Sequence, residues 1–229
     1  MSEIVRKMFA DISKKYDFMN NILSFGIHKY WRKKTVELSQ AKVGDNVLDC
    51  ATGTGDLAIE FYKNVQPLGT VLATDFCKEM LDLAIKKFKL KNYPIKTQIE
   101  DVMNLSFEDN TFDIASIAFG IRNVDDTIIC LSELARVVKP GGKVVVLEFG
   151  QSYGLFSFLY KIYSKIFIPL IGKIFANSKI AYNYLQETAS KYPCREEFLN
   201  IMKTTKKFSK LFYKPVTSGI AYIYVGEVI

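Results

Sequence analysis

The sequence predicts an α/β fold around one mostly parallel, seven-stranded sheet with an antiparallel C-terminal strand. Two observations support this prediction. Strand-like apolar runs alternate with helical patterns through the middle of the chain, at 46–50, 70–74, 95–99, 111–118 and 143–148. This alternation is typical of parallel strands joined by helices that cover both faces of a sheet. Two further strand-like runs, 208–213 and 220–225, close the chain and predict an antiparallel pair.

The length and composition favour a single domain. A chain of 229 residues with 49% hydrophobic side chains can bury one substantial core. We expect an N-terminal helical lid, a sheet core that binds a ligand, an aromatic and basic helical insertion, and a C-terminal strand pair. These parts span residues 1–40, 41–149, 150–205 and 206–229.

The spacing of apolar residues outside the sheet predicts the N-terminal elements. It indicates helices over 3–15 and 29–40, separated by a loop over 15–27. The Pro-Gly-Gly run at 140–142 predicts a sharp turn into the strand that begins at Lys143.

Charge is unevenly distributed along the chain. Residues 1–149 contain 20 basic and 20 acidic side chains, whereas residues 150–229 contain 11 and 4, so the excess of +7 lies in the C-terminal third. The same third has an aromatic helical pattern over 153–175, and two short helices are expected before residue 206. Such asymmetry is typical of a surface that meets an anionic partner, either membrane headgroups or nucleic acid. A solvated basic face is the alternative.

Cysteine usage and hydropathy indicate the compartment. The four cysteines, Cys50, Cys77, Cys130 and Cys194, are widely spaced and include no Cys-x-x-Cys pair. This argues against a disulfide framework or a zinc cluster and is typical of a reducing cytoplasm. The chain lacks an apolar leader, and its uncharged stretches are shorter than the roughly 20 residues of a membrane span. We therefore expect a cytoplasmic protein that holds no metal.

The most informative stretch is NVLDCATGTGDL at residues 46–57. It joins the end of a buried strand to a helix through the tight turn formed by Gly53, Thr54 and Gly55. Glycines let a ligand approach the main chain beside the amino end of the helix. Asp75 follows Gly55 by 20 residues, just after the next strand, where an acid accepts hydrogen bonds from ribose hydroxyls. The pattern predicts a nucleoside-containing cofactor.

Two classes of cofactor fit this loop. Residues 53–58 match GxGxxA, which is found in nicotinamide dehydrogenases. However, the loop lies 50 residues into the chain, and the only Tyr-x-x-x-Lys, formed by Tyr30 and Lys34, precedes it. The acid and the small residues at 49–55 match the loop that binds S-adenosylmethionine, with Ala51 in place of the first glycine.

Candidate cofactor contacts lie at the ends of the first three strands. Asp49 is expected to orient the methionine part, Asp75 to accept from the ribose, and Asp101 with the backbone of Val102 to recognise the adenine edge. Roles in shaping the loop or a turn are the alternatives for Asp49 and Asp101. The complete candidate set is Asp49, Ala51, Gly53, Thr54, Gly55, Asp75, Phe76, Asp101, Val102 and Ala118.

Several further stretches resemble the ubiquinone/menaquinone biosynthesis C-methyltransferases. The two signatures of that family are similar to KYDFMNNILSFGIHKYW at 15–31 and RVVKPGGKVVVLEF at 136–149. Shorter similar stretches are FEDNTFD at 107–113, AFGIRNV at 118–124, Tyr-x-Tyr-Leu at 182–185 and TSGI at 217–220. The resemblance covers nearly the whole chain. It departs from the family at 51–52, where Ala-Gly is common, and at 150–151, where serine usually follows Glu-Phe.

The resemblance implies a class I S-adenosylmethionine-dependent methyltransferase fold with a helical cap. It also implies methylation of a ring carbon of a demethylated polyprenyl quinol. Arg122 and Asn123 directly follow the fourth strand, where a guanidinium stabilises a developing phenolate and an amide orients the other ring oxygen. An ion pair of Arg122 with Asp125 or Asp126 is the alternative. Tyr16 is expected in a lid over the cofactor, with a part in proton transfer.

The acid–base group and the ring are left open by the sequence. His28 is the only histidine, and it acts either as a base or as a cap for the helix that starts near Lys29. The acceptor is either a benzoquinol or a naphthoquinol.

The implied substrate also suggests how the insertion is used. Its aromatic side chains would line a channel for the tail, while Lys161, Lys165 and Lys173 would meet anionic headgroups. We expect reversible peripheral docking at the inner face of the cytoplasmic membrane. Ordinary core packing or a homodimer interface is the alternative for the same aromatics.

Two other functions are alternatives to quinol methylation. Basic charge suits an RNA methyltransferase, but no Asn/Asp-Pro-Pro-Tyr follows the fourth strand, which argues against a nucleic-acid partner. A non-catalytic scaffold that binds the cofactor within a lipid-synthesis complex is less consistent with an intact loop followed by Arg122 and Asn123.

Overall fold

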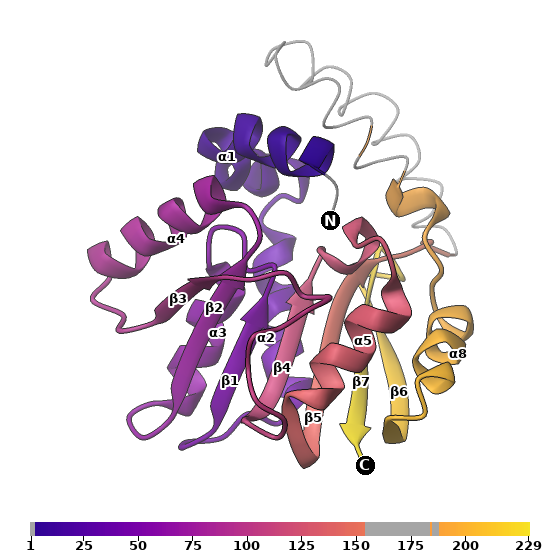
Figure 1. Cartoon of the computed structure of the whole chain (residues 1–229). Coiled ribbons are helices and arrows are strands. Elements are labelled where there is room, and N and C mark those ends of the chain that lie inside the picture. The colour runs from indigo at the N-terminus through magenta and orange to yellow at the C-terminus, as the bar shows by residue number, and fades with distance from the viewer. Residues whose placement is uncertain (1–2, 154–183, 185–187) are drawn as a thin grey trace.

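Seven strands form one mixed sheet in the order β3-β2-β1-β4-β5-β7-β6 in the computed structural model, which describes residues 3–153, 184 and 188–229 (Figure 1). The first five strands pair in parallel, and β7 runs antiparallel to both β5 and β6. The strands are β1 Asn46–Cys50, β2 Thr70–Asp75, β3 Lys96–Ile99, β4 Phe112–Ala118, β5 Val138–Phe149, β6 Phe208–Val216 and β7 Ala221–Val228. The predicted fold class is confirmed.

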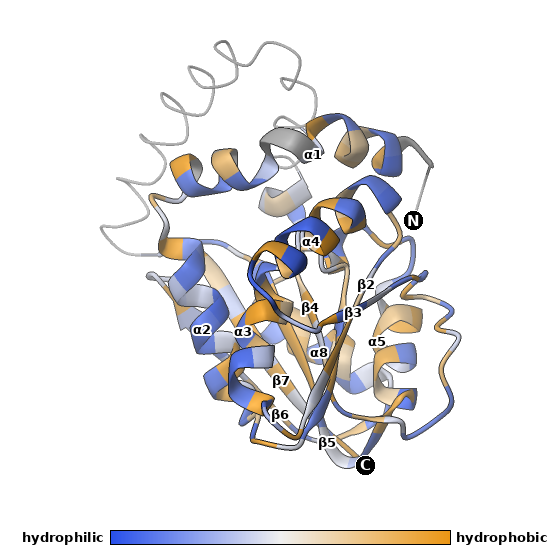
Figure 2. Ribbon diagram, turned by 90° about the vertical axis from the view of Figure 1, so that its left-hand side faces the viewer, coloured by the Kyte–Doolittle hydropathy of each residue, from blue (hydrophilic) through white to orange (hydrophobic). Residues whose placement is uncertain are grey.

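Helices cover both faces of the sheet, so its central strands are apolar on both sides. In β5, Val144 and Val146 belong to one core, whereas Val145 and Leu147 belong to the other. The helices α2 Ile27–Ser39, α3 Asp56–Val65 and α4 Lys78–Leu90 contribute to the second core, and α5 Thr127–Arg136 and α8 Glu196–Thr204 to the first. Figure 2 shows hydrophobic colour on the central strands, whereas the edge strand β3 is mostly hydrophilic.

The N-terminal helix α1, Glu3–Leu23, lies across the carboxyl ends of the parallel strands and beside α4 (Figures 1 and 2). The predicted loop over 15–27 is therefore wrong, because α1 continues to Leu23 and α2 begins at Ile27. Asp and Asn favour turns in isolation, but here Asp17 is held by side chains of the glycine loop and α4. Tertiary contacts thus override the local preference.

The strand β5 also begins earlier than predicted. It starts at Val138, so the Pro-Gly-Gly run lies within the strand rather than before it. The register shifts there, with Phe112 opposite Val138 but Ile114 opposite Lys143, as in a β-bulge. Gly142 allows the close approach, because a Cβ at this position would lie 2.6 Å from the Asp113 carbonyl oxygen.

The C-terminal third is described in part. The aromatic segment expected over 153–175, with Lys161, Lys165 and Lys173, lies almost entirely outside the described residues. Of the short helices expected before residue 206, α8 is described. Within the described ranges, no helix combines the length and the apolar character that crossing a bilayer requires.

Candidate active site

A small cavity lies where the carboxyl ends of β1 and β4 meet α1 and α2. It has a volume of about 20 Å³, close to the space that one water needs. Its lining combines the glycine loop with residues of α1, α2 and the end of β4, namely Tyr16, Arg32, Asp49, Ala51, Thr52, Gly53, Thr54, Leu57, Ala118 and Phe119. The structure thus brings together six of the residues that the sequence predicted.

The two glycines of the loop serve different purposes. Gly53 and Gly55 both adopt left-handed backbone, with φ of +58° and +82°, which favours glycine. A Cβ on Gly53 would meet the Met80 and Tyr16 side chains at 3.8 and 4.0 Å, so the left-handed backbone rather than a clash favours glycine here. A Cβ on Gly55 would lie 2.3 Å from the Phe88 ring, so this glycine permits close packing of the loop on α4.

Two buried aspartates hold the loop in shape. Asp49 accepts hydrogen bonds from the hydroxyls of Thr52 (2.6 Å) and Ser116 (2.7 Å). Asp75, at the end of β2, accepts from the backbone N–H groups of Gly53 (2.7 Å) and Cys77 (2.8 Å). Burial raises the pKa of Asp49 and of Asp75 to about 6, although these hydrogen bonds favour the charged forms.

The helix α1 is joined to the glycine loop by a polar network. The Thr54 hydroxyl donates to Asp17 Oδ1 over 2.5 Å, and Lys87 of α4 pairs with Asp17 Oδ2 at 2.6 Å. Lys87 also pairs with Asp56 at 2.7 Å. Tyr16 lines the cavity beside Gly53. These contacts hold the second half of α1 against the glycine loop and α4.

Arg32 of α2 is a site residue that the sequence analysis missed. It is buried, lines the cavity with Asp49, and lies 3.9 Å from Asp56. An arginine on an amphipathic helix normally lies on the solvent-exposed face, so the residue type alone did not predict a place in the site. Its position directly after Trp31, which ends the first signature, was the one available indication.

The remaining cofactor candidates lie outside the small cavity. Asp101 follows β3, and its carboxylate accepts from the backbone N–H of Met103 at 3.0 Å, which matches the turn role held as an alternative. Val102 is buried in the core, and Phe76 follows Asp75 directly. The structure gives no further contact that assigns these residues to adenine.

Arg122 and Asn123 lie in the short 3₁₀ helix η1, Ile121–Asn123, after β4. Arg122 Nη1 pairs with Glu148 Oε1 at 2.5 Å, a partner that the sequence did not suggest. Asp126, one of the expected partners, instead caps α5 by accepting from the backbone of Ile128 and Ile129. Asn123 is buried, and its Oδ1 accepts from the Tyr184 hydroxyl at 3.4 Å.

His28 does not cap α2, because it lies inside the helix and the N-cap residue is Gly26. Its ring is buried, and Nδ1 lies 2.6 Å from the Ser24 hydroxyl. Burial lowers the pKa of His28 to about 4, helped by the neighbouring Arg32 charge. The histidine is therefore neutral at pH 7, and it is not among the residues that line the cavity.

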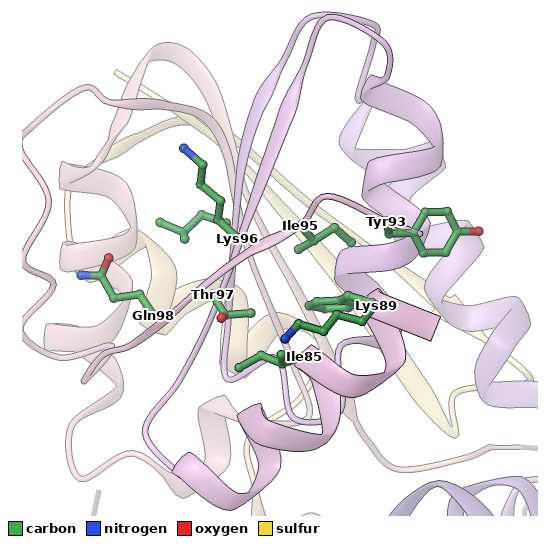
Figure 3. A pocket seen from close by; sticks show the side chains of 9 residues that line it. Ile85, Lys89, Tyr93, Ile95, Lys96, Thr97 and Gln98 are labelled. Atoms are coloured by element: carbon green, nitrogen blue, oxygen red, sulfur yellow. The ribbon is translucent and has the colours of Figure 1, made fainter. Parts of the chain in front are cut away.

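A larger cavity of about 420 Å³ lies at the other edge of the molecule, between α4 and β3 (Figure 3). Its lining includes Phe88 and Ile95 together with Lys89 and Lys96. It includes no residue of the glycine loop, so size alone does not identify the functional site.

The same fold occurs in solved methyltransferase structures. A solved structure described as an S-adenosylmethionine-dependent methyltransferase from Methanococcus maripaludis matches with a TM-score of 0.68 and 22% identity, covering 100% of this chain and 97% of that one. Another from Thermotoga maritima gives a TM-score of 0.66 and 15% identity over 96% and 99% of the two chains. The strand order and the glycine loop of this chain are therefore those of the α/β methyltransferase fold.

Sequence comparison identifies the branch of that class. The model of the ubiE/COQ5 methyltransferase family matches residues 1–227, and the chain belongs to this family. The ubiquinone/menaquinone biosynthesis C-methyltransferase UbiE of Bdellovibrio bacteriovorus is 53% identical over 99% of this chain and 96% of its own length. The demethylmenaquinone methyltransferase of Staphylococcus aureus is 41% identical over 98% and 92%.

Proposed function

We propose that this enzyme transfers a methyl group from S-adenosylmethionine to a ring carbon of a demethylated polyprenyl quinol. The product is menaquinol from demethylmenaquinol, or the methylated ubiquinone precursor. The observation that carries the proposal is the position of Phe119. This residue lines the cofactor cavity, and its carbonyl accepts from Arg122 Nη1 (2.9 Å) and Asn123 Nδ2 (3.4 Å). The names of the relatives from B. bacteriovorus and S. aureus support the choice of substrate.

The donor set around the cavity fits the cofactor. The Asp75 carboxylate has lone pairs left for ribose hydroxyls, because each oxygen accepts one hydrogen bond from the backbone. The Arg32 guanidinium would pair with the cofactor carboxylate, and Asp49 would orient its ammonium group. Asp101 and Val102 would contact adenine. S-adenosylmethionine, when bound, supplies a methyl group activated by its sulfonium.

The protein must then orient the acceptor and keep its oxygen ionised. Arg122 would stabilise the phenolate charge, and Asn123 would hold the second ring oxygen. Both follow β4 at the edge of the sheet where ligands of this fold bind. Tyr16, on the face of α1 that meets the loop, would exclude water from the reacting carbon. No covalent enzyme intermediate is needed, so positioning carries much of the rate.

Transfer of labelled methyl groups tests this function. We expect label from S-adenosylmethionine in chemically reduced demethylmenaquinol in detergent micelles, and none in bulk tRNA assayed in parallel. Label in RNA alone would contradict the proposal and favour an RNA methyltransferase with a phosphate-binding basic face. Cofactor binding without transfer to either acceptor would favour the scaffold alternative.

We further infer that the enzyme docks reversibly on an anionic membrane surface, where its substrate resides. The net charge of +7 over residues 150–229 supports this inference, as do exposed lysines on and before β6, such as Lys207, Lys210 and Lys214. Sedimentation with anionic and neutral vesicles tests it. We expect binding to anionic vesicles that weakens with salt, whereas equal and negligible binding to both would refute it. Sedimentation velocity without vesicles tests the homodimer alternative.

A further inference from the structure

Arg122 and Glu148 form a buried ion pair at the carboxyl edge of the sheet. Arg122 follows β4 and Glu148 is the penultimate residue of β5, and these two strands are neighbours. The side chains are only 3% and 1% exposed. The guanidinium also lies over the Phe149 ring, with 5.4 Å between Cζ and the ring centroid. Both groups are therefore held in one place and shielded from solvent.

One donor and one acceptor of this pair remain unused. Glu148 Oε1 accepts from Arg122 Nη1 and from the backbone N–H of Phe149 (2.8 Å). Among the described residues, Arg122 Nε and Glu148 Oε2 have no hydrogen-bond partner, although both are buried. Leaving such groups unpaired is costly, so in a native structure they point to a missing partner. A hydroxyl group fits, because it both donates and accepts.

We propose that Glu148 is the base of the methyl transfer and removes the proton of the acceptor's phenolic hydroxyl. This inference rests on the proposed function. The phenolic O–H donates to Glu148 Oε2, and its oxygen accepts from Arg122 Nε–H. The O–H bond breaks, a bond from the proton to Oε2 forms, and the electron pair stays on the oxygen, where Arg122 stabilises it.

The later steps return the proton. Electron density from the phenolate makes the ring carbon nucleophilic, so that a C–C bond to the methyl group forms while the bond from methyl carbon to sulfur breaks. The ring carbon then loses its own hydrogen as a proton to solvent, which restores aromaticity. Glu148 gives its proton back to the phenolate oxygen. The net result is one methyl group gained and one proton released per turnover.

Other candidate bases are less suitable. Arg122 cannot accept a proton, because its guanidinium stays charged. Asp49 uses both carboxylate oxygens for the hydroxyls of Thr52 and Ser116. His28 Nδ1 is bound to the Ser24 hydroxyl, and burial lowers its pKa to about 4, which makes it a weak base.

The surroundings of Glu148 favour proton uptake. Burial raises the pKa of the Glu148 carboxyl above its ordinary value, and the Arg122 charge opposes this effect. The other ionisable groups that act on it are Tyr192, before α8, and Tyr224 of β7. Burial raises the pKa of both phenols, so they stay protonated through the assay range. Glu148 is thus the group that titrates within the pair.

The pH profile of Glu148→Gln tests the proposal. We expect kcat for methyl transfer to a reduced demethylmenaquinol to fall at least about 100-fold, which is the usual lower bound for loss of general base catalysis. The acidic limb of the profile should disappear as well. The control is Glu227→Gln on β7, which carries the same change in the same sheet but pairs with exposed Lys210. It should keep both the rate and the profile of the unmodified enzyme.

An acceptor with a more acidic hydroxyl distinguishes two roles for Glu148. It acts either as the base that removes the phenolic proton or only as a group that positions Arg122. A quinol with an electron-withdrawing ring substituent ionises without help, so the loss caused by Glu148→Gln should shrink about tenfold or more. Glu148→Asp keeps a carboxylate and should retain the acidic limb at a reduced rate. Calorimetric binding of S-adenosylmethionine shows whether Glu148→Gln is folded. If it is not, Glu148→Asp takes its place in the test.

Two results would overturn the inference. One is an equal loss with all acceptors and an unchanged pH profile, which would make Glu148 a structural support for Arg122. The other is an acidic limb that persists in a folded Glu148→Gln enzyme. Failure of the proposed function would look different, because the unmodified enzyme would then bind the cofactor but methylate no quinol.

Discussion

Asp17 of α1 accepts a hydrogen bond of 2.5 Å from the hydroxyl of Thr54 in the glycine loop, although the two residues are 37 positions apart. The second oxygen of Asp17 pairs with Lys87 of α4. One carboxylate therefore links the helix that covers the site to both the loop and the neighbouring helix. The cavity beneath, with a volume of about 20 Å³, is lined by residues of both α1 and the glycine loop.

Asp17→Asn should loosen this link. An asparagine can still accept from Thr54 but has no charge for Lys87, whose remaining carboxylate partner in the described network is Asp56. We expect hydrogen exchange in the second half of α1 to quicken and cofactor dissociation to become about 3- to 10-fold faster, because the lost contact contributes on the order of 1 kcal/mol.

The matched control for that prediction is Asp82→Asn. Asp82 also pairs with a lysine at 2.7 Å, but on the exposed face of α4. It should leave exchange in α1 unchanged. Identical exchange in the two variants would show that the Asp17 contacts do not restrain the helix.

Gly120 and Ala51 are predicted to be energetically coupled. A Cβ on Gly120 would lie 2.6 Å from the Ala51 Cβ, and 3.2 Å from the nearest side-chain atom of Ile117. Gly120→Ala should therefore destabilise the protein by about 1–3 kcal/mol through overpacking. Ala51→Gly removes the clashing methyl group and also relieves a non-glycine residue at φ +48°.

Denaturant unfolding of both single variants and of the double variant measures this coupling. The double variant should recover more than half of the loss seen in Gly120→Ala. Strictly additive free energies of unfolding would mean that the two Cβ positions do not meet. Binding of S-adenosylhomocysteine provides a second readout, since both residues border the cofactor loop.

Asp75→Ala should weaken cofactor binding by roughly 10- to 100-fold. Hydrogen bonds to a charged group contribute about 1.5–3 kcal/mol, and Asp75 also positions the backbone N–H of Gly53. Titration calorimetry with S-adenosylmethionine measures the change, with Asp109→Ala as control because Asp109 pairs with Arg136 on the surface. An unchanged affinity would place the ribose elsewhere.

Strand positions were the most predictable part of the fold. Residues such as Val144 to Leu147 are buried on both faces of the sheet, so the sequence shows an unbroken apolar run. The glycine loop was equally visible, because a left-handed backbone at Gly53 and Gly55 restricts the choice of residue. Local chemistry determines both features, and local chemistry can be recognised without knowing the fold.

Features that depend on distant contacts were missed. Residues 15–23 extend α1 because Asp17 meets the glycine loop and α4, which no local pattern encodes. The sequence contains Arg32 and Glu148, but nothing in it marks them as buried. An arginine on a helix and a carboxylate at the end of a strand are usually exposed to solvent. Their roles emerge only when tertiary packing removes water around them.

The stability of the folded enzyme should depend on the protonation of Asp75. Burial raises the pKa of Asp75 to about 6, above the value near 3.9 of an unfolded chain. The folded state therefore binds this proton more tightly, and its contribution to stability is present below pH 4 and lost as pH rises through 6. Asp75→Asn cannot titrate. The free energy of unfolding of the unmodified enzyme, relative to this variant, should fall by about 2 kcal/mol between pH 4.5 and 7.5.

Cofactor binding should reverse that trend. Ribose hydroxyls that donate to Asp75 favour its charged form, so S-adenosylmethionine should bind more tightly as pH rises through 6 and should release protons on binding. Calorimetry in buffers of different ionisation enthalpy counts these protons. The Asp75→Asn variant should release fewer protons than the unmodified enzyme. Burial also raises the pKa of Asp49 to about 6, but protons from Asp49 contribute equally to both proteins. Parallel stability profiles and equal proton release would show that Asp75 is already charged in the folded enzyme and that its burial has little energetic effect.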